Sequence, residues 1–201
     1  MNLNHAAEQG DGWETIASET CFETDHLRVA QERVRSPARA EGRDWTVVHR
    51  KAAVVIAAMT AERKLVLIRQ ERIPIRTAIW EMPAGQIDHA TGESIDLSAV
   101  ALRELREETG YELAASGELI PLGDFFSSPG FTDERSSLFL ARPVKPGPDG
   151  PAHDDAETIL DCREFDFHEI GRMIATNEIR DANTLSVCAR LVARGLISLR
   201  A

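Results

Sequence analysis

The sequence predicts an α/β fold with a buried sheet, preceded by a smaller antiparallel sheet. Two apolar segments, residues 52–59 and 65–68, lie on either side of a charged turn, as expected for strands that are buried on both faces. The segment from Leu97 to Gly110 repeats apolar side chains at helical spacing and ends at a glycine. The length of 201 residues and the hydrophobic content of 43% suit one α/β domain with added elements.

The chain before residue 51 is predicted to form the smaller sheet. Residues 1–12 are polar and are expected to be disordered, whereas residues 13–50 are assigned to an N-terminal sheet region. Strands are expected at Cys21–Val34 and Asp44–His49, with a turn between them at Ser36–Gly42. The main domain is then predicted to cover residues 51–201.

The second half of the chain is predicted to complete the main domain. Strands are expected at Ser136–Ala141 and Leu160–Phe167, and helices at Phe167–Asn177 and Asn183–Arg194. A Pro/Gly-rich loop is expected between the two strands, at Arg142–Asp155. Helices that follow strands in this way cover the faces of a sheet.

Charge and composition exclude several classes of protein. The net charge of −10 and the pI near 5.1 argue against a nucleic-acid surface. No apolar run approaches the ~20 residues that span a bilayer, and residues 1–12 lack a signal-peptide core. The three cysteines are widely spaced and odd in number, so we expect reduced thiols. The sequence therefore predicts a cytoplasmic protein that binds neither nucleic acid nor membranes.

Three glutamates on the predicted helix indicate a metal site. At about 100° per residue, Glu104, Glu107 and Glu108 share one narrow stripe, which continues the apolar side formed by Leu97 and Ala101. Carboxylates that face inward need a partner for their charge, and a hard cation such as Mg²⁺ or Mn²⁺ accepts oxygen ligands. The alternative is that all three are ordinary solvated helix residues that make i,i+4 contacts.

The residues around these glutamates carry a family resemblance. The segment from Gly85 to Tyr111 resembles the Nudix box, whose second half is matched in register by Arg103, Glu104, Leu105, Glu107, Glu108 and Gly110. The resemblance implies a Nudix-type α/β/α sandwich with a mixed sheet, in which the box forms a loop, a helix and a second loop. It also implies that residues 51–201 form a catalytic domain with a divalent metal.

The first half of the box departs from the family pattern. Seven residues separate Gly85 from Glu93 and nine separate Glu93 from Arg103, where the pattern has five and seven. Either Ser94 caps a longer helix, or Asp96 is the N-cap and the extra residues precede the helix. Both alternatives leave the three glutamates in place and put the role of Glu93 as a ligand in doubt.

Segments outside the box resemble the ADP-ribose and nucleoside diphosphate sugar pyrophosphatases within the family. By that resemblance, Arg72, Glu81 and Arg50 contact the substrate, and the carbonyl of Ala84 is a metal ligand beside Glu104 and Glu108. The Ser-Pro-Gly loop of this branch matches residues 127–135, which makes Pro129 a further substrate contact.

The resemblance also suggests the catalytic groups and the assembly. Glu157, in an acidic loop, is the first candidate for the general base and Glu134 the second, while Glu107 assists the metal. Trp45 and the segment 26–29 match the part of the family's N-terminal sheet that contacts adenine. This branch exchanges that sheet between subunits, so a homodimer is implied.

The predicted reaction is metal-assisted hydrolysis of the diphosphate of ADP-ribose or a related nucleoside diphosphate sugar, which gives AMP and ribose 5-phosphate in the case of ADP-ribose. GDP-mannose or a dinucleotide such as NADH is the alternative substrate. A module that senses a nucleotide sugar without hydrolysing it is the alternative of another class.

Overall fold

The computed structural model describes residues 12–87, 95–152 and 158–199. The segment 1–12, for which disorder is predicted, lies almost wholly outside these ranges, as do Glu93, Ser94 and Glu157. None of the helices in the described ranges is both long and apolar enough to cross a membrane.

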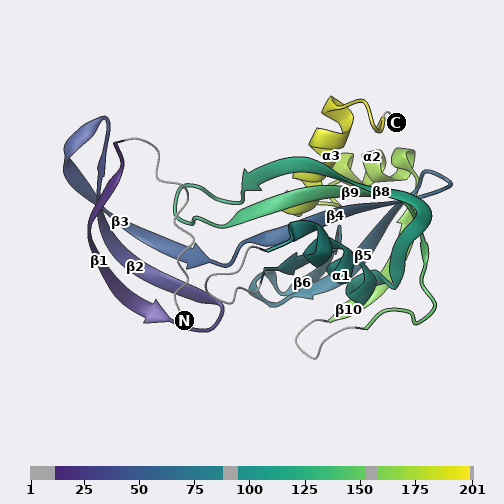
Figure 1. Ribbon diagram of the computed structural model, residues 1–201, viewed down its shortest axis with the longest axis horizontal. Helices are drawn as coiled ribbons and strands as arrows, with labels where there is room; N and C mark the ends of the chain where they lie inside the picture. Colours follow the sequence, from purple (N-terminus) through teal and green to yellow (C-terminus); the bar gives the residue numbers. More distant parts are fainter. Residues whose placement is uncertain (1–11, 88–94, 153–157, 200–201) are drawn as a thin grey trace.

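The main domain is built on a mixed sheet with the order β10-β5-β4-β9-β8, to which β6 and β7 add beside β5 and β4 (Figure 1). Its strands are β4 (Ala53–Thr60), β5 (Leu65–Arg72), β6 (Thr77–Glu81), β7 (Ala84–Gln86), β8 (Tyr111–Phe126), β9 (Arg135–Pro146) and β10 (Ile159–Phe165). The β4–β9 pair is parallel and the other pairs are antiparallel. The buried sheet predicted from residues 52–59 and 65–68 is confirmed.

Helices cover both faces of this sheet. The helices are α1 (Leu97–Thr109), α2 (Phe167–Ala175) and α3 (Ala182–Ala193). Alternate residues of β4 belong to two separate apolar clusters: Val55 packs with side chains of α2 and α3, whereas Val54 packs with side chains of α1. The α/β/α sandwich is therefore confirmed, and it explains why β4 is apolar at almost every position.

The N-terminal sheet extends away from the main domain (Figure 1) and has the order β1-β2-β3. Its antiparallel strands are β1 (Glu14–Glu23), β2 (Leu27–Ser36) and β3 (Arg39–Arg50). The single predicted strand Cys21–Val34 is wrong, because the chain turns at Thr24, whose Oγ1 accepts the N–H groups of His26 and Leu27. The turn between β2 and β3 is also shorter than the predicted turn Ser36–Gly42, because β3 begins at Arg39.

Other strands were missed or misplaced by the sequence. The 16-residue strand β8 is absent from the prediction because its register shifts twice, once between Leu113 and Glu118 and once between Pro121 and Gly123, which hides the alternation of buried and exposed residues. The predicted loop from Arg142 is wrong at its start, since β9 continues to Pro146. The helices α2 and α3 lie within two residues of the predicted ranges.

Candidate active site

The box helix begins at a side-chain cap and ends at a glycine. Asp96 is the N-cap, and its Oδ1 accepts the N–H of Ser98 at 2.9 Å. Gly110 ends the helix in the left-handed region with φ of 73°, and its N–H donates to the carbonyl of Arg106. Of the two predicted helix starts, the one at Asp96 is therefore confirmed, and the extra residues of the box precede the helix.

Two of the three glutamates of α1 turn into the protein. Glu104 and Glu108 are buried, with exposed fractions of 8% and 1%. Glu108 Oε2 accepts the N–H of Ala84 at 2.9 Å, which ties the helix to β7. A Cβ on Gly85 would lie 1.9 Å from the carboxylate carbon of Glu104, so only glycine leaves room for this carboxylate. Glu104 and Glu108 thus meet the backbone of Ala84 and Gly85.

The carbonyl of Ala84 points toward the same side as its N–H. On β4, Ile56 donates its N–H to the carbonyl of Pro83, so the next pair, Val55 opposite Ala84, is a position without ladder bonds. At such a position both backbone groups point away from the partner strand. Since the N–H of Ala84 reaches Glu108 on α1, its carbonyl also lies on the side of α1.

Glu107 differs from its two neighbours. Its side chain is 34% exposed and forms an ion pair with Arg103, which also contacts Glu104 Oε1. Burial lowers the pKa of Arg103, but the charges of Glu104 and Glu107 outweigh it, so the pKa is raised and the guanidinium stays charged. Glu107 is therefore the half-exposed member of the three and makes the i,i+4 contact with Arg103, whereas Glu104 and Glu108 are buried.

The donors gathered here fit a hard divalent cation. Within the described ranges, no three side chains of Asp, Glu, His or Cys gather closely enough to hold a metal ion. The described donors are instead two buried carboxylates, Glu104 and Glu108, and the carbonyl side of Ala84. These are all oxygens, which Mg²⁺ and Mn²⁺ accept together with water and substrate phosphate.

Arg72 and Glu81 form an ion pair on the neighbouring strands β5 and β6, in which Glu81 is buried and Arg72 is half-buried. Arg72 Nε donates to both carboxylate oxygens of Glu81, at 2.9 and 3.1 Å. Burial raises the pKa of Glu81 even though Arg72 acts in the opposite direction. The pKa of Arg72 is raised, first by its hydrogen bond to Glu81 and also by the charge of Glu108. The sequence predicted both as substrate contacts; in the structure Glu81 holds Arg72, which is the more exposed partner.

A threonine that the sequence analysis missed fixes the turn before Ala84. Thr184 is fully buried on α3, and its Oγ1 accepts the N–H of Met82 at 2.9 Å while donating to Asp181 Oδ2. Asp181 is the N-cap of α3 and also accepts the N–H of Thr184. An Asp three residues before a Thr signals the helix cap, but nothing in the local pattern indicates its contact with Met82, 102 residues away.

Arg50 and Glu134 pair at the beginning of the parallel strands. Arg50 Nη1 lies 3.1 Å from Glu134 Oε1, and Ser127 Oγ donates to Glu134 Oε2 at 2.6 Å. Arg50 is the last residue of β3, and Glu134 directly precedes β9. The structure therefore brings Arg50 and Glu134 together.

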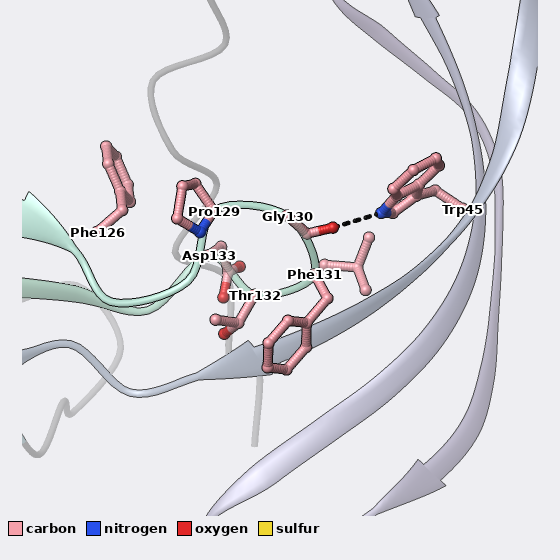
Figure 2. Close-up of a pocket in the computed structure, with 8 residues that line it drawn as sticks. Trp45, Phe126, Pro129, Gly130, Phe131, Thr132 and Asp133 are labelled. Atoms are coloured by element: carbon pink, nitrogen blue, oxygen red, sulfur yellow. Dashed lines mark hydrogen bonds between the residues drawn. The ribbon is translucent and has the colours of Figure 1, made fainter.

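Pro129 belongs to a loop that packs on β3. A pocket of about 280 Å³ is lined by Trp45, Val47, Phe126, Pro129, Gly130, Phe131, Thr132 and Asp133. Figure 2 shows the indole of Trp45 directed at Gly130, where Nε1 donates to the carbonyl at 2.9 Å. The N–H of Val48 donates to the carbonyl of Phe131, so backbone and side-chain contacts both hold the loop.

Comparisons with known proteins agree with this architecture. A family model described as the NUDIX domain matches residues 48–188. An ADP-ribose pyrophosphatase of Bacillus subtilis (strain 168) is 32% identical over 171 residues, which cover 85% of this chain and 87% of the relative. A methanol dehydrogenase activator of Bacillus methanolicus is 33% identical over 171 residues, covering 85% and 88%.

The fold has a counterpart among solved structures. A crystal structure of an ADP compounds hydrolase superposes with a TM-score of 0.72 at 18% identity, covering 92% of this chain and 97% of that chain. This likeness shows that the two folds agree. The family match, the relatives and the box helix with its buried glutamates together show that this chain belongs to the Nudix family of hydrolases.

Proposed function

We propose that this Nudix hydrolase cleaves the diphosphate of ADP-ribose or a related nucleoside diphosphate sugar, giving AMP and ribose 5-phosphate from ADP-ribose. The observation that carries the proposal is the buried pair Glu104 and Glu108 against the backbone of Ala84 and Gly85. The name of the Bacillus subtilis relative, an ADP-ribose pyrophosphatase, supports the substrate class.

Each described residue of the site has a proposed role. Glu104, Glu108 and the Ala84 carbonyl would hold Mg²⁺ or Mn²⁺. When bound, such an ion neutralises diphosphate oxygens and lowers the pKa of water. Arg103 keeps Glu104 and Glu107 oriented, and Glu107 assists from the more exposed side. Arg72, fixed by Glu81, offers its charge to a phosphate oxygen.

The proposed general base is Glu157, which takes a proton from the attacking water as the leaving oxygen departs in line. Glu157 lies outside the described residues. Glu134 is the second candidate, but its carboxylate is already engaged by Arg50 and Ser127. We propose that Glu134 and Arg50 instead support the substrate loop that carries Pro129.

The pocket beside Pro129 is the proposed site of the nucleoside. Its aromatic rings, Trp45, Phe126 and Phe131, are 44–52% exposed and suit stacking with a base. A nucleoside diphosphate sugar is elongated, so its base and its diphosphate need separate subsites. The pocket is lined by residues of β3 and of the segment 126–133, whereas Glu108 of α1 lies against β7.

We propose a homodimer that forms through the N-terminal sheet. Trp13, Ile16 and Phe22 are large apolar side chains with exposed fractions of 42–58% in or beside the edge strand β1. Exposed apolar residues on an edge strand are typical of a protein interface. Sedimentation equilibrium tests this: a dimer is expected, and a monomer at micromolar concentration contradicts it.

The test of the reaction is a panel of nucleoside diphosphate derivatives, incubated with Mg²⁺ or Mn²⁺ and coupled to a phosphatase that acts only on the monoester products. We expect ADP-ribose to release phosphate, and chelation of the metal to abolish the release. Faster release from GDP-mannose or NADH would reassign the substrate. Tight calorimetric binding of ADP-ribose without any product would instead indicate a sensor.

A further inference from the structure

His49 lies between two carboxylates that come from different segments of the chain. Its Nδ1 is 2.6 Å from Asp133 Oδ2, and its Nε2 is 3.3 Å from Glu32 Oε1. The three side chains are only 13–17% exposed. His49 is in β3, Glu32 is in β2, and Asp133 belongs to the loop of residues 127–134, which we call the Pro129 loop. One imidazole therefore links the N-terminal sheet to this loop.

The arrangement suits the protonated ring. A neutral imidazole donates from one nitrogen and presents a lone pair from the other, which would face a carboxylate; an imidazolium donates to both. The hydrogen bond to Asp133 raises the pKa of His49 above its ordinary value near 6.5, against the effect of burial. The charge of Glu32 acts in the same direction as Asp133, and that of Arg28, on β2, opposes them.

Asp133 connects the Pro129 loop to β3 through both of its carboxylate oxygens. Its other oxygen, Oδ1, accepts the N–H of Arg50 at 3.2 Å, so the carboxylate is held by two successive residues of β3. The same loop meets β3 at Trp45 and Val48 through hydrogen bonds that do not depend on titration. The contact with His49 is the titratable one among these.

We propose that protonated His49 is a positioning residue that locks the Pro129 loop onto the N-terminal sheet and thereby sets the affinity of the pocket for the nucleoside. The link between loop position and substrate affinity rests on the function proposed above. The lock itself is a property of the fold and can be measured without substrate.

The direction of the pH dependence follows from the shift. Because the folded-state pKa of His49 is raised, the contact is fully present below about pH 6.5 and is lost as the pH rises through the folded-state pKa. Above the folded-state pKa of His49, the Pro129 loop loses its contact with the imidazolium. The KM for ADP-ribose is therefore expected to rise about tenfold, the factor that corresponds to about 1.4 kcal/mol of binding free energy. The kcat is expected to change little, because the hydrogen bonds of His49 go to Asp133 and Glu32, to which the proposed function gives no part in the chemical step.

The experiment is an NMR titration of the full chain that follows the imidazole of His49 and the indole N–H of Trp45. The Trp45 signal is expected to shift with the same midpoint as His49, since both residues contact the Pro129 loop. Glu32→Gln removes one carboxylate without touching the loop and should lower both midpoints together. A Trp45 signal that does not follow His49, or a midpoint unchanged in Glu32→Gln, overturns the proposal.

Kinetics provide the second measurement. The rise in KM with pH is expected to disappear in His49→Gln and to move to lower pH in Glu32→Gln, whereas the exposed control His168→Gln keeps it. A KM profile in His49→Gln that matches the unmodified protein overturns the inference. If no substrate of the panel is hydrolysed, the proposed function fails, while a shared NMR midpoint for His49 and Trp45 still supports the lock.

Discussion

The carboxylate of Glu104 packs directly against Gly85: a Cβ on Gly85 would lie 1.9 Å from the carboxylate carbon of Glu104. One residue belongs to β7 and the other to α1, so this contact sets how closely the strand and the helix approach. It gives the glycine at the start of the box a physical role: a side chain there would displace the carboxylate of Glu104.

Gly85→Ala is therefore expected to push Glu104 out of place and to reduce both metal affinity and turnover. Overpacking of this kind costs about 1–3 kcal/mol of stability. Thermal unfolding and Mn²⁺ binding followed by electron paramagnetic resonance measure the two effects. In the control Gly130→Ala, the added methyl meets no atom within 4 Å, so its melting temperature should not fall. Unchanged Mn²⁺ affinity in Gly85→Ala would refute the steric role.

Thr184→Val tests how the turn before Ala84 is held. The variant keeps the shape of the side chain but leaves the N–H of Met82 without its acceptor, which costs about 1–3 kcal/mol for a buried group. We expect a lower unfolding free energy in urea and a lower kcat. Thr184→Ser retains the hydroxyl and should recover most of the kcat. If valine and serine behave alike, the hydrogen bond has no such role.

The three cysteines are expected to differ in reactivity. Burial raises the pKa of Cys188 to about 12 and that of Cys162 to about 11, so at pH 8 less than about one in a thousand of either thiol is ionised. Cys21 is exposed. Ellman's reagent should thus titrate one fast thiol in the native protein at pH 8 and three after denaturation. A fast phase that persists in Cys21→Ser would contradict this.

The elements that the sequence predicted well are those in which local pattern and burial agree. The apolar run 52–59 matches β4 within one residue because helices cover both faces, and α1 is marked by Asp96 and Gly110 at its ends. The strand β8 was missed because bulges interrupt its alternation. Helical spacing alone also does not predict that Glu107, which pairs with Arg103, is more exposed than Glu104 and Glu108.

The parts of the site that depend on long-range contacts were beyond local pattern. Thr184 meets Met82 across 102 residues, and His49 meets Asp133 across 84. Such contacts depend on how the folded chain brings distant segments together, and the residue spacing within either segment does not predict them. The roles of Glu157 and Glu134 as general base, and of Arg50, Arg72, Glu81 and Pro129 in binding substrate, stay predictions.

The most direct test of the cation site is the turnover of ADP-ribose by Glu108→Gln with Mg²⁺. The amide can still accept the N–H of Ala84, so the fold should be kept, while the loss of a charged ligand should lower kcat by about 100-fold or more. The matched control is Glu118→Gln, an exposed residue of β8 that pairs with Arg142 and should leave kcat unchanged. If Glu108→Gln hydrolyses ADP-ribose at nearly the normal rate, Glu108 does not hold the catalytic cation and the account is wrong.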